Sequence, residues 1–117
     1  MPQRAYSANE DEELFWNVER LWQLANDLPV ERIPLTEFED VFASKLWFGP
    51  EGITCREFVE KVKAVNEVDL SYPIILASDG WIMDGRTRLQ KALLLGKQDI
   101  AAVKFVQMPE PDERKPK

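Results

Sequence analysis

The chain contains no histidine and a single cysteine, Cys55. Without histidine, neither histidine-based acid–base catalysis nor a histidine-ligated zinc site can form. One cysteine cannot form an internal disulfide, which is typical of a reducing compartment. No apolar run approaches the roughly 20 residues that a transmembrane helix needs, and the acidic N-terminal segment is unlike a signal peptide. We therefore expect a soluble, cytoplasmic protein that has no metal site and does not contact a membrane.

The length and composition predict one folded domain. The chain has 117 residues, of which 44% are hydrophobic, and it contains four tryptophans. A chain of this size buries roughly two thirds of its unfolded surface, which is enough for one hydrophobic core. Its hydrophobic fraction is too high for an intrinsically disordered protein.

The charge is unevenly distributed along the chain. The net charge is −6, so we do not expect direct DNA binding by the surface as a whole. Residues 1–84 carry 7 basic and 17 acidic side chains, whereas residues 85–117 carry 8 basic and 4 acidic ones. The C-terminal part is therefore positive and favours an anion locally, unless the two parts interleave in space and cancel.

The N-terminal part predicts a helical extension. We expect residues 1–8 to be a flexible leader and residues 9–28 to form an amphipathic helix, which Pro29 ends. Asn9 and Glu12 have the spacing of a capping box. Trp16 and Trp22 either belong to the core or provide a surface for a second copy, and the second alternative predicts a homodimer through this helix.

Residues 30–67 predict a strand and two helices. The segment around Ile33 is extended, and Pro34 indicates a sheet edge. Two capping boxes indicate helix starts, Thr36 with Glu39 and Thr54 with Glu57. The second helix has one apolar face, formed by Phe58, Val62 and Val65. Trp47 and Phe48, in the loop between the helices, either cover a site or fill the core.

Residues 73–117 give the clearest pattern. Ile74–Ala77 reads as a buried strand, residues 78–80 as a tight turn and Trp81–Asp84 as its hairpin partner. Arg86–Leu95 predicts a helix that Gly96 ends, and residues 100–106 predict a last strand. Residues 108–117 contain three prolines and alternating charges, so we expect a disordered tail. The predicted class is α/β (α+β), with one domain over residues 9–107.

The stretch Asp84–Gly85–Arg86–Thr87–Arg88 lies between a strand and a helix and predicts an anion site. A helix N-terminus presents free N–H groups and the positive end of the helix dipole. Gly85 lets a ligand approach the backbone, and Thr87 offers a hydroxyl. Of the two arginines, Arg88 is the better candidate for paired hydrogen bonds to phosphate. The alternative is an ordinary connection with solvated arginines.

The segment YPIILASDGWIMDGRTRLQKALLLGKQDIAAVKF resembles the core of the ParB/sulfiredoxin superfamily. Together with ERIPLTEFED, which is similar to the opening strand and helix of that family, the resemblance covers Glu31–Phe105. It implies a small mixed sheet with helices packed on it, and a nucleotide or phosphorylated group bound at a Gly-x-His-Arg or Gly-x-Arg-Arg box. Gly85 and Arg88 fall on the first and last positions of that box. Asp84 precedes it, and Arg86 falls on a variable position.

The chain departs from the family at several points. Thr87 replaces the histidine of many small relatives, and the box has no cysteine, so sulfiredoxin chemistry is excluded. Cys55 lies far from the box in sequence and is expected to be a helix-start residue rather than a nucleophile. The second nucleotide box and the helix-turn-helix of chromosome partition proteins are also missing.

Three functions follow from this pattern. The first is a regulatory or interaction module that binds a nucleotide or phosphate. The second is a Mg²⁺-dependent enzyme, either a nuclease or one that hydrolyses or transfers phosphate, with a nucleoside triphosphate and Mg²⁺ as the possible cofactor. Its carboxylate would be Glu31 or Glu37, with Glu39 and Asp40 as further candidates, although acidic residues at such positions usually only cap helices. The third is a structural dimer whose ancestral site is inactive.

Overall fold

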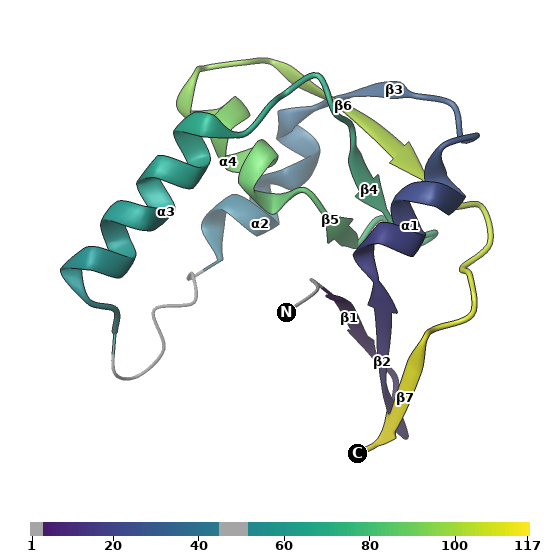
Figure 1. Ribbon diagram of the computed structural model, residues 1–117. Helices are drawn as coiled ribbons and strands as arrows, with labels where there is room; N and C mark the ends of the chain where they lie inside the picture. Colours follow the sequence, from purple (N-terminus) through teal and green to yellow (C-terminus); the bar gives the residue numbers. More distant parts are fainter. Residues whose placement is uncertain (1–3, 45–51) are drawn as a thin grey trace.

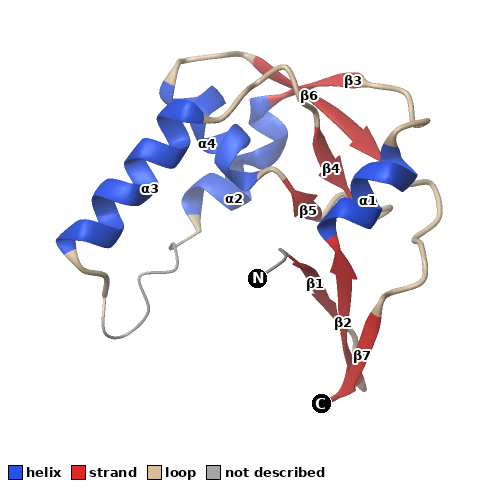
Figure 2. Ribbon diagram, in the orientation of Figure 1, coloured by secondary structure: helices blue, strands red, loops and turns tan. Residues whose placement is uncertain are grey.

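The computed structural model describes residues 4–44 and 52–117, and it shows a mixed α+β arrangement of helices and two sheets (Figures 1 and 2). The first sheet is antiparallel, in the order β1-β2-β7, with strands β1 (Arg4–Ala8), β2 (Glu12–Asn17) and β7 (Glu113–Pro116). The second has the order β3-β6-β4-β5, with strands β3 (Glu31–Pro34), β4 (Ile74–Leu76), β5 (Ile82–Asp84) and β6 (Asp99–Lys104). The helices are α1 (Val18–Ala25), η1 (Leu35–Phe38), α2 (Glu39–Ala43), α3 (Cys55–Glu67) and α4 (Arg86–Leu94).

The second sheet confirms the strands predicted for the C-terminal half. β4 and β5 form an antiparallel hairpin, β6 pairs parallel with β4, and β3 pairs antiparallel with β6. β3 is an edge strand, as Pro34 predicted, because proline cannot donate a backbone hydrogen bond to a neighbour. The turn between β4 and β5 closes as expected, with the amide of Gly80 donating to the carbonyl of Ala77.

Both faces of strands β4, β5 and β6 are covered, so these strands are largely apolar on both sides, whereas the edge strand β3 is mostly exposed. Side chains alternate between the faces along each strand. On one face, Ile75, Met83 and Val103 pack with Leu21 of α1, Trp16 of β2 and Phe105, which follows β6. On the other face, Ile74, Leu76, Ile82 and Ile100 pack with Leu89 of α4 and Phe38 of η1. Burial on two faces explains why the sequence here reads as continuous apolar runs.

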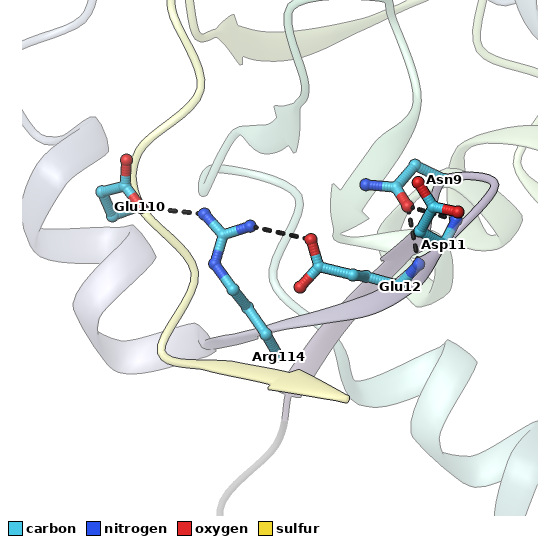
Figure 3. Close-up of polar contacts among 5 residues, drawn as sticks. All are labelled: Asn9, Asp11, Glu12, Glu110 and Arg114. Atoms are coloured by element: carbon cyan, nitrogen blue, oxygen red, sulfur yellow. Dashed lines mark hydrogen bonds and ion pairs between the residues drawn. The ribbon is translucent and has the colours of Figure 1, made fainter. Parts of the chain in front are cut away.

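The N-terminal part differs from the predicted leader and long helix. Residues 4–8 form β1, residues 12–17 form β2, and the helix begins only at Val18. The side-chain oxygen of Asn9 accepts hydrogen bonds from the amides of Asp11 and Glu12, at 2.9 and 2.7 Å (Figure 3). These are the bonds of a helix cap, but here they close the turn of a hairpin. The residue that caps α1 is Asn17, which accepts from the amide of Arg20.

The C-terminal segment is ordered rather than a disordered tail. β7 pairs antiparallel with β2, and the guanidinium of Arg114 bridges the carboxylates of Glu12 and Glu110 (Figure 3). The indole nitrogen of Trp16 donates to the carbonyl of Pro109 at 2.9 Å. Prolines and charges are compatible with an exposed edge strand, so composition alone does not separate this arrangement from disorder.

Of the three predicted capping boxes, only that of Thr54 is confirmed. The hydroxyl oxygen of Thr54 accepts from the amide of Glu57 at 3.1 Å and begins α3. Thr36 caps nothing, because η1 begins directly after Pro34 and has no side-chain cap. α3 extends away from the second sheet (Figure 1), and its predicted apolar face is exposed: 53% of Phe58 and 43% of Val62 are accessible.

Within residues 4–44 and 52–117, no helix combines the length and hydropathy needed to cross a membrane.

Candidate functional site

The predicted anion-binding stretch forms a sharp turn between β5 and α4. Asp84 is the last residue of β5, and Gly85 is the residue before the first turn of α4. No side chain caps this helix start. The first N–H groups of α4 therefore lack both an intrahelical acceptor and a cap, and they form the positive end of the helix dipole.

Gly85 is required by the backbone and by its neighbour in the core. Its φ is 110°, a conformation that residues with a side chain rarely adopt. A Cβ at this position would lie 2.5 Å from Cγ2 of Ile74, which is fully buried. The sequence suggested that glycine is there to admit a ligand, whereas the structure gives a sufficient reason in the turn itself.

The Arg88 guanidinium is turned toward the protein. Its Nη2 donates to the carboxylate of Asp84 at 3.1 Å and to the carbonyl of Pro73 at 3.2 Å. The side chains of Arg88 and Asp84 are only 13% and 14% exposed, and the Nε of Arg88 is buried without a hydrogen-bond partner. Trp22 of α1 completes this cluster, because its indole nitrogen donates to the same oxygen of Asp84 at 2.8 Å.

Arg86 lies differently from Arg88. Its guanidinium carbon is 5.1 Å from the ring centroid of Trp81, a cation–π distance. In the described part of the chain, none of the ion pairs involves Arg86. Its positive charge is therefore not neutralised by a carboxylate, unlike that of Arg88.

A cleft of about 760 Å³ opens over this turn. The five residues Asp84–Arg88 all line it, so the structure brings the predicted site residues together in one concave surface. Trp81, just before β5, also lines it, and other lining residues come from distant parts of the chain: Arg4, Ala5 and Tyr6 of β1, Trp22 of α1, and Ala64, Glu67 and Val68 at the end of α3. Sequence reasoning missed the contribution of β1, because it assigned these residues to a loose leader.

The candidate catalytic carboxylates lie elsewhere. Glu31 is an exposed residue of β3, and β3 and β5 form opposite edges of the second sheet. Glu37, Glu39 and Asp40 are exposed in η1 and α2 and do not line the cleft. The carboxylates that do line it are Asp84, which is paired with Arg88, and Glu67. Among the residues that the structure describes, no group of three or more acidic or cysteine side chains is arranged to hold a metal ion.

The aromatic candidates separate into two groups. Trp16 is 2% exposed and belongs to the core, so it offers no surface to a second copy, whereas Trp22 is half exposed in the cleft. Trp47 and Phe48, the predicted lid, lie outside the described residues. Cys55 is exposed at the start of α3 and does not line the cleft.

No family model, no curated protein and no solved structure matches this chain. The geometry and charge of the cleft are therefore the basis for assigning a function.

Proposed function

We propose that this chain is a small domain of the ParB/sulfiredoxin type that binds a nucleotide or another phosphate-bearing ligand in the cleft over Asp84–Arg88. We propose further that it acts in the cytoplasm as a regulatory or interaction module. The observation that carries the proposal is that the turn predicted to bind an anion lines a cleft of about 760 Å³, a volume within the usual range of small-molecule sites. The order of strand, turn, strand, box, helix and strand supports the family type.

The charges in the cleft suit a phosphate group. The first N–H groups of α4 are uncapped, and together with the positive end of the helix dipole they favour an anion at the start of the helix. Arg86 adds a guanidinium without a carboxylate partner, next to Trp81. The charge of Arg88 is paired with Asp84, and its Nη2 is held by Asp84 and by the carbonyl of Pro73. The geometry therefore favours Arg86 as the movable ligand and Arg88 as the residue that fixes the turn.

A binding module fits the cleft better than an enzyme does. Turnover assisted by Mg²⁺ requires carboxylates close to the phosphate. Glu31 and Glu37 do not line the cleft, and the carboxylate of Asp84 already accepts from Arg88 and Trp22. A purely structural dimer through the exposed face of α1 is the remaining alternative, and it predicts that no nucleotide binds.

Isothermal titration with nucleoside triphosphates and with inorganic tripolyphosphate tests the proposal. We expect binding at or below millimolar concentration, and we expect Arg86→Gln to weaken it about tenfold, because a hydrogen bond to a charged group contributes about 1.5–3 kcal/mol. Arg32→Gln is the matched control, since Arg32 is an exposed strand residue paired with Asp99 and does not line the cleft. The proposal is wrong if the wild-type protein binds none of these compounds, and release of phosphate with Mg²⁺ would favour the enzyme instead.

A further inference from the structure

Besides the Asp84–Arg88 turn, a second wall lines the cleft, and binding of a phosphate group at the turn does not need it. This wall comes from β1, which lies beside β5, and it includes Arg4 and Tyr6. Tyr6 and Trp81 both line the cleft and also line a smaller adjacent cavity, so they lie at the same end of the cleft. The site therefore joins a phosphate-binding turn to an aromatic end, and residues from two different sheets form it.

Three large aromatic side chains of this cleft are about half exposed. Tyr6 is 47% exposed, Trp22 is 50% exposed and Trp81 is 52% exposed. The indole nitrogen of Trp22 is committed to Asp84, next to the turn. Trp81 carries Arg86 against its ring, and Tyr6 is tilted against Phe15 with a centroid distance of 5.4 Å. Half-exposed rings gathered in one concave surface are typical of a site that receives a planar apolar group.

We propose that the ligand is a nucleotide whose base stacks at the Tyr6–Trp81 end of the cleft while its phosphates lie over the start of α4. This inference rests on the proposed function and specifies its substrate class. According to this inference, β1 makes the cleft bind nucleotides more tightly than phosphates that lack a base. Aromatic rings stack on bases with little regard to base identity, since every base has a π face. Tyr6 is therefore the residue expected to separate nucleotides from inorganic polyphosphates.

The test compares two classes of ligand on matched variants. Wild-type protein is titrated with ATP, GTP, CTP and UTP, and separately with tripolyphosphate, at one ionic strength and one Mg²⁺ concentration. We expect at least one nucleotide to bind about tenfold more tightly than tripolyphosphate, a preference within the range of one base stacked on an aromatic ring. Tyr6→Ala should remove most of this preference without changing tripolyphosphate binding, and Tyr6→Phe should keep it.

Tyr72→Ala is the matched control, because Tyr72 is 64% exposed and does not line the cleft. Circular dichroism of each variant establishes that it is folded, and Tyr6→Phe retains the cross-strand contact with Phe15. Equal affinity for nucleotides and tripolyphosphate would overturn the inference and leave phosphate binding standing. A nucleotide preference that survives Tyr6→Ala would overturn the role of β1. Absence of binding by every compound would overturn the proposed function as well.

Discussion

The indole nitrogen of Trp22 donates a hydrogen bond of 2.8 Å to the carboxylate of Asp84, across 62 residues of sequence. The same carboxylate oxygen accepts from Arg88, which in turn donates to the carbonyl of Pro73. This chain of contacts joins α1, β5, α4 and the segment before β4. The N-terminal part is therefore built into the candidate site rather than attached to a complete core.

Replacing Trp22 by phenylalanine tests this connection. Trp22→Phe keeps an aromatic ring but removes the donor to Asp84, so we expect a loss of about 1 kcal/mol in the free energy of unfolding, the usual net contribution of one hydrogen bond. Urea denaturation followed by circular dichroism measures it. Trp81→Phe is the control, since Trp81 is similarly exposed and its indole makes none of the hydrogen bonds found in the described residues. Equal stability of the two variants would contradict the structural role of the Trp22–Asp84 bond.

Gly85→Ala tests whether the turn requires glycine for its own geometry. The added methyl group would be strained by the φ of 110° and would lie 2.5 Å from Cγ2 of Ile74. Gly80→Ala is the matched control, with a φ of 92° and no atom within 4 Å of its added Cβ. We expect backbone strain of about 1 kcal/mol at both positions, and a further 1–3 kcal/mol at Gly85 from overpacking. Denaturant midpoints of the two variants measure the difference in stability. If Gly85→Ala were no less stable than Gly80→Ala, the side chain of Ile74 would be able to move away from the added methyl group at no cost in free energy.

The part of the fold that the sequence predicted correctly is the part with strong local signals. Ile74–Ala77 is a continuous apolar run, Gly80 fixes a tight turn, and Gly85 and Gly96 bracket a helix. Each signal acts within a few residues, so it is visible without knowledge of distant contacts. The five residues of the predicted anion-binding stretch were selected on the same kind of local signal, and they line one cleft.

The N-terminal sheet could not be predicted because its signals are ambiguous. Asn9 followed by Glu12 fits both a helix cap and a hairpin turn, since the same side-chain oxygen satisfies the same kind of backbone donors. β1 pairs with β2 within one hairpin, but β2 also pairs with β7, a contact between residues far apart in the chain. The place of Tyr6 in the cleft depends on the contact between β1 and β5, which are far apart in the chain, so no local pattern reveals it.

The stability of the junction between the C-terminal segment and α1 should depend on pH. The backbone amide of Asn17 donates to Asp112 at 2.7 Å, and with the guanidinium of Arg20 it holds the pKa of Asp112 below its ordinary value of 3.8. A lowered folded-state pKa contributes stability that is complete above the ordinary value and is lost as the pH falls through the lower one. We expect Asp112→Asn to be less stable than wild type at pH 7, with a difference that shrinks as the pH is lowered past 3.8. Urea midpoints measured across this range check it, and a difference that stays constant at acid pH would contradict the assignment.

Removing the C-terminal segment tests whether it is a structural element or a tail. A chain ending at Gln107 lacks β7 and the carbonyl of Pro109 that accepts from Trp16. Trp16 is 2% exposed in the complete chain, so its exposure should cost about 2 kcal/mol or more and shift its fluorescence toward longer wavelength. The control keeps the full length and replaces Glu113 and Lys115 by glutamine, which removes their ion pairs but preserves the backbone pairing with β2. A truncated protein with the unfolding midpoint and tryptophan emission of the control would mean that β7 contributes nothing to the core, whereas a large loss confined to the truncation would show that the segment covers Trp16.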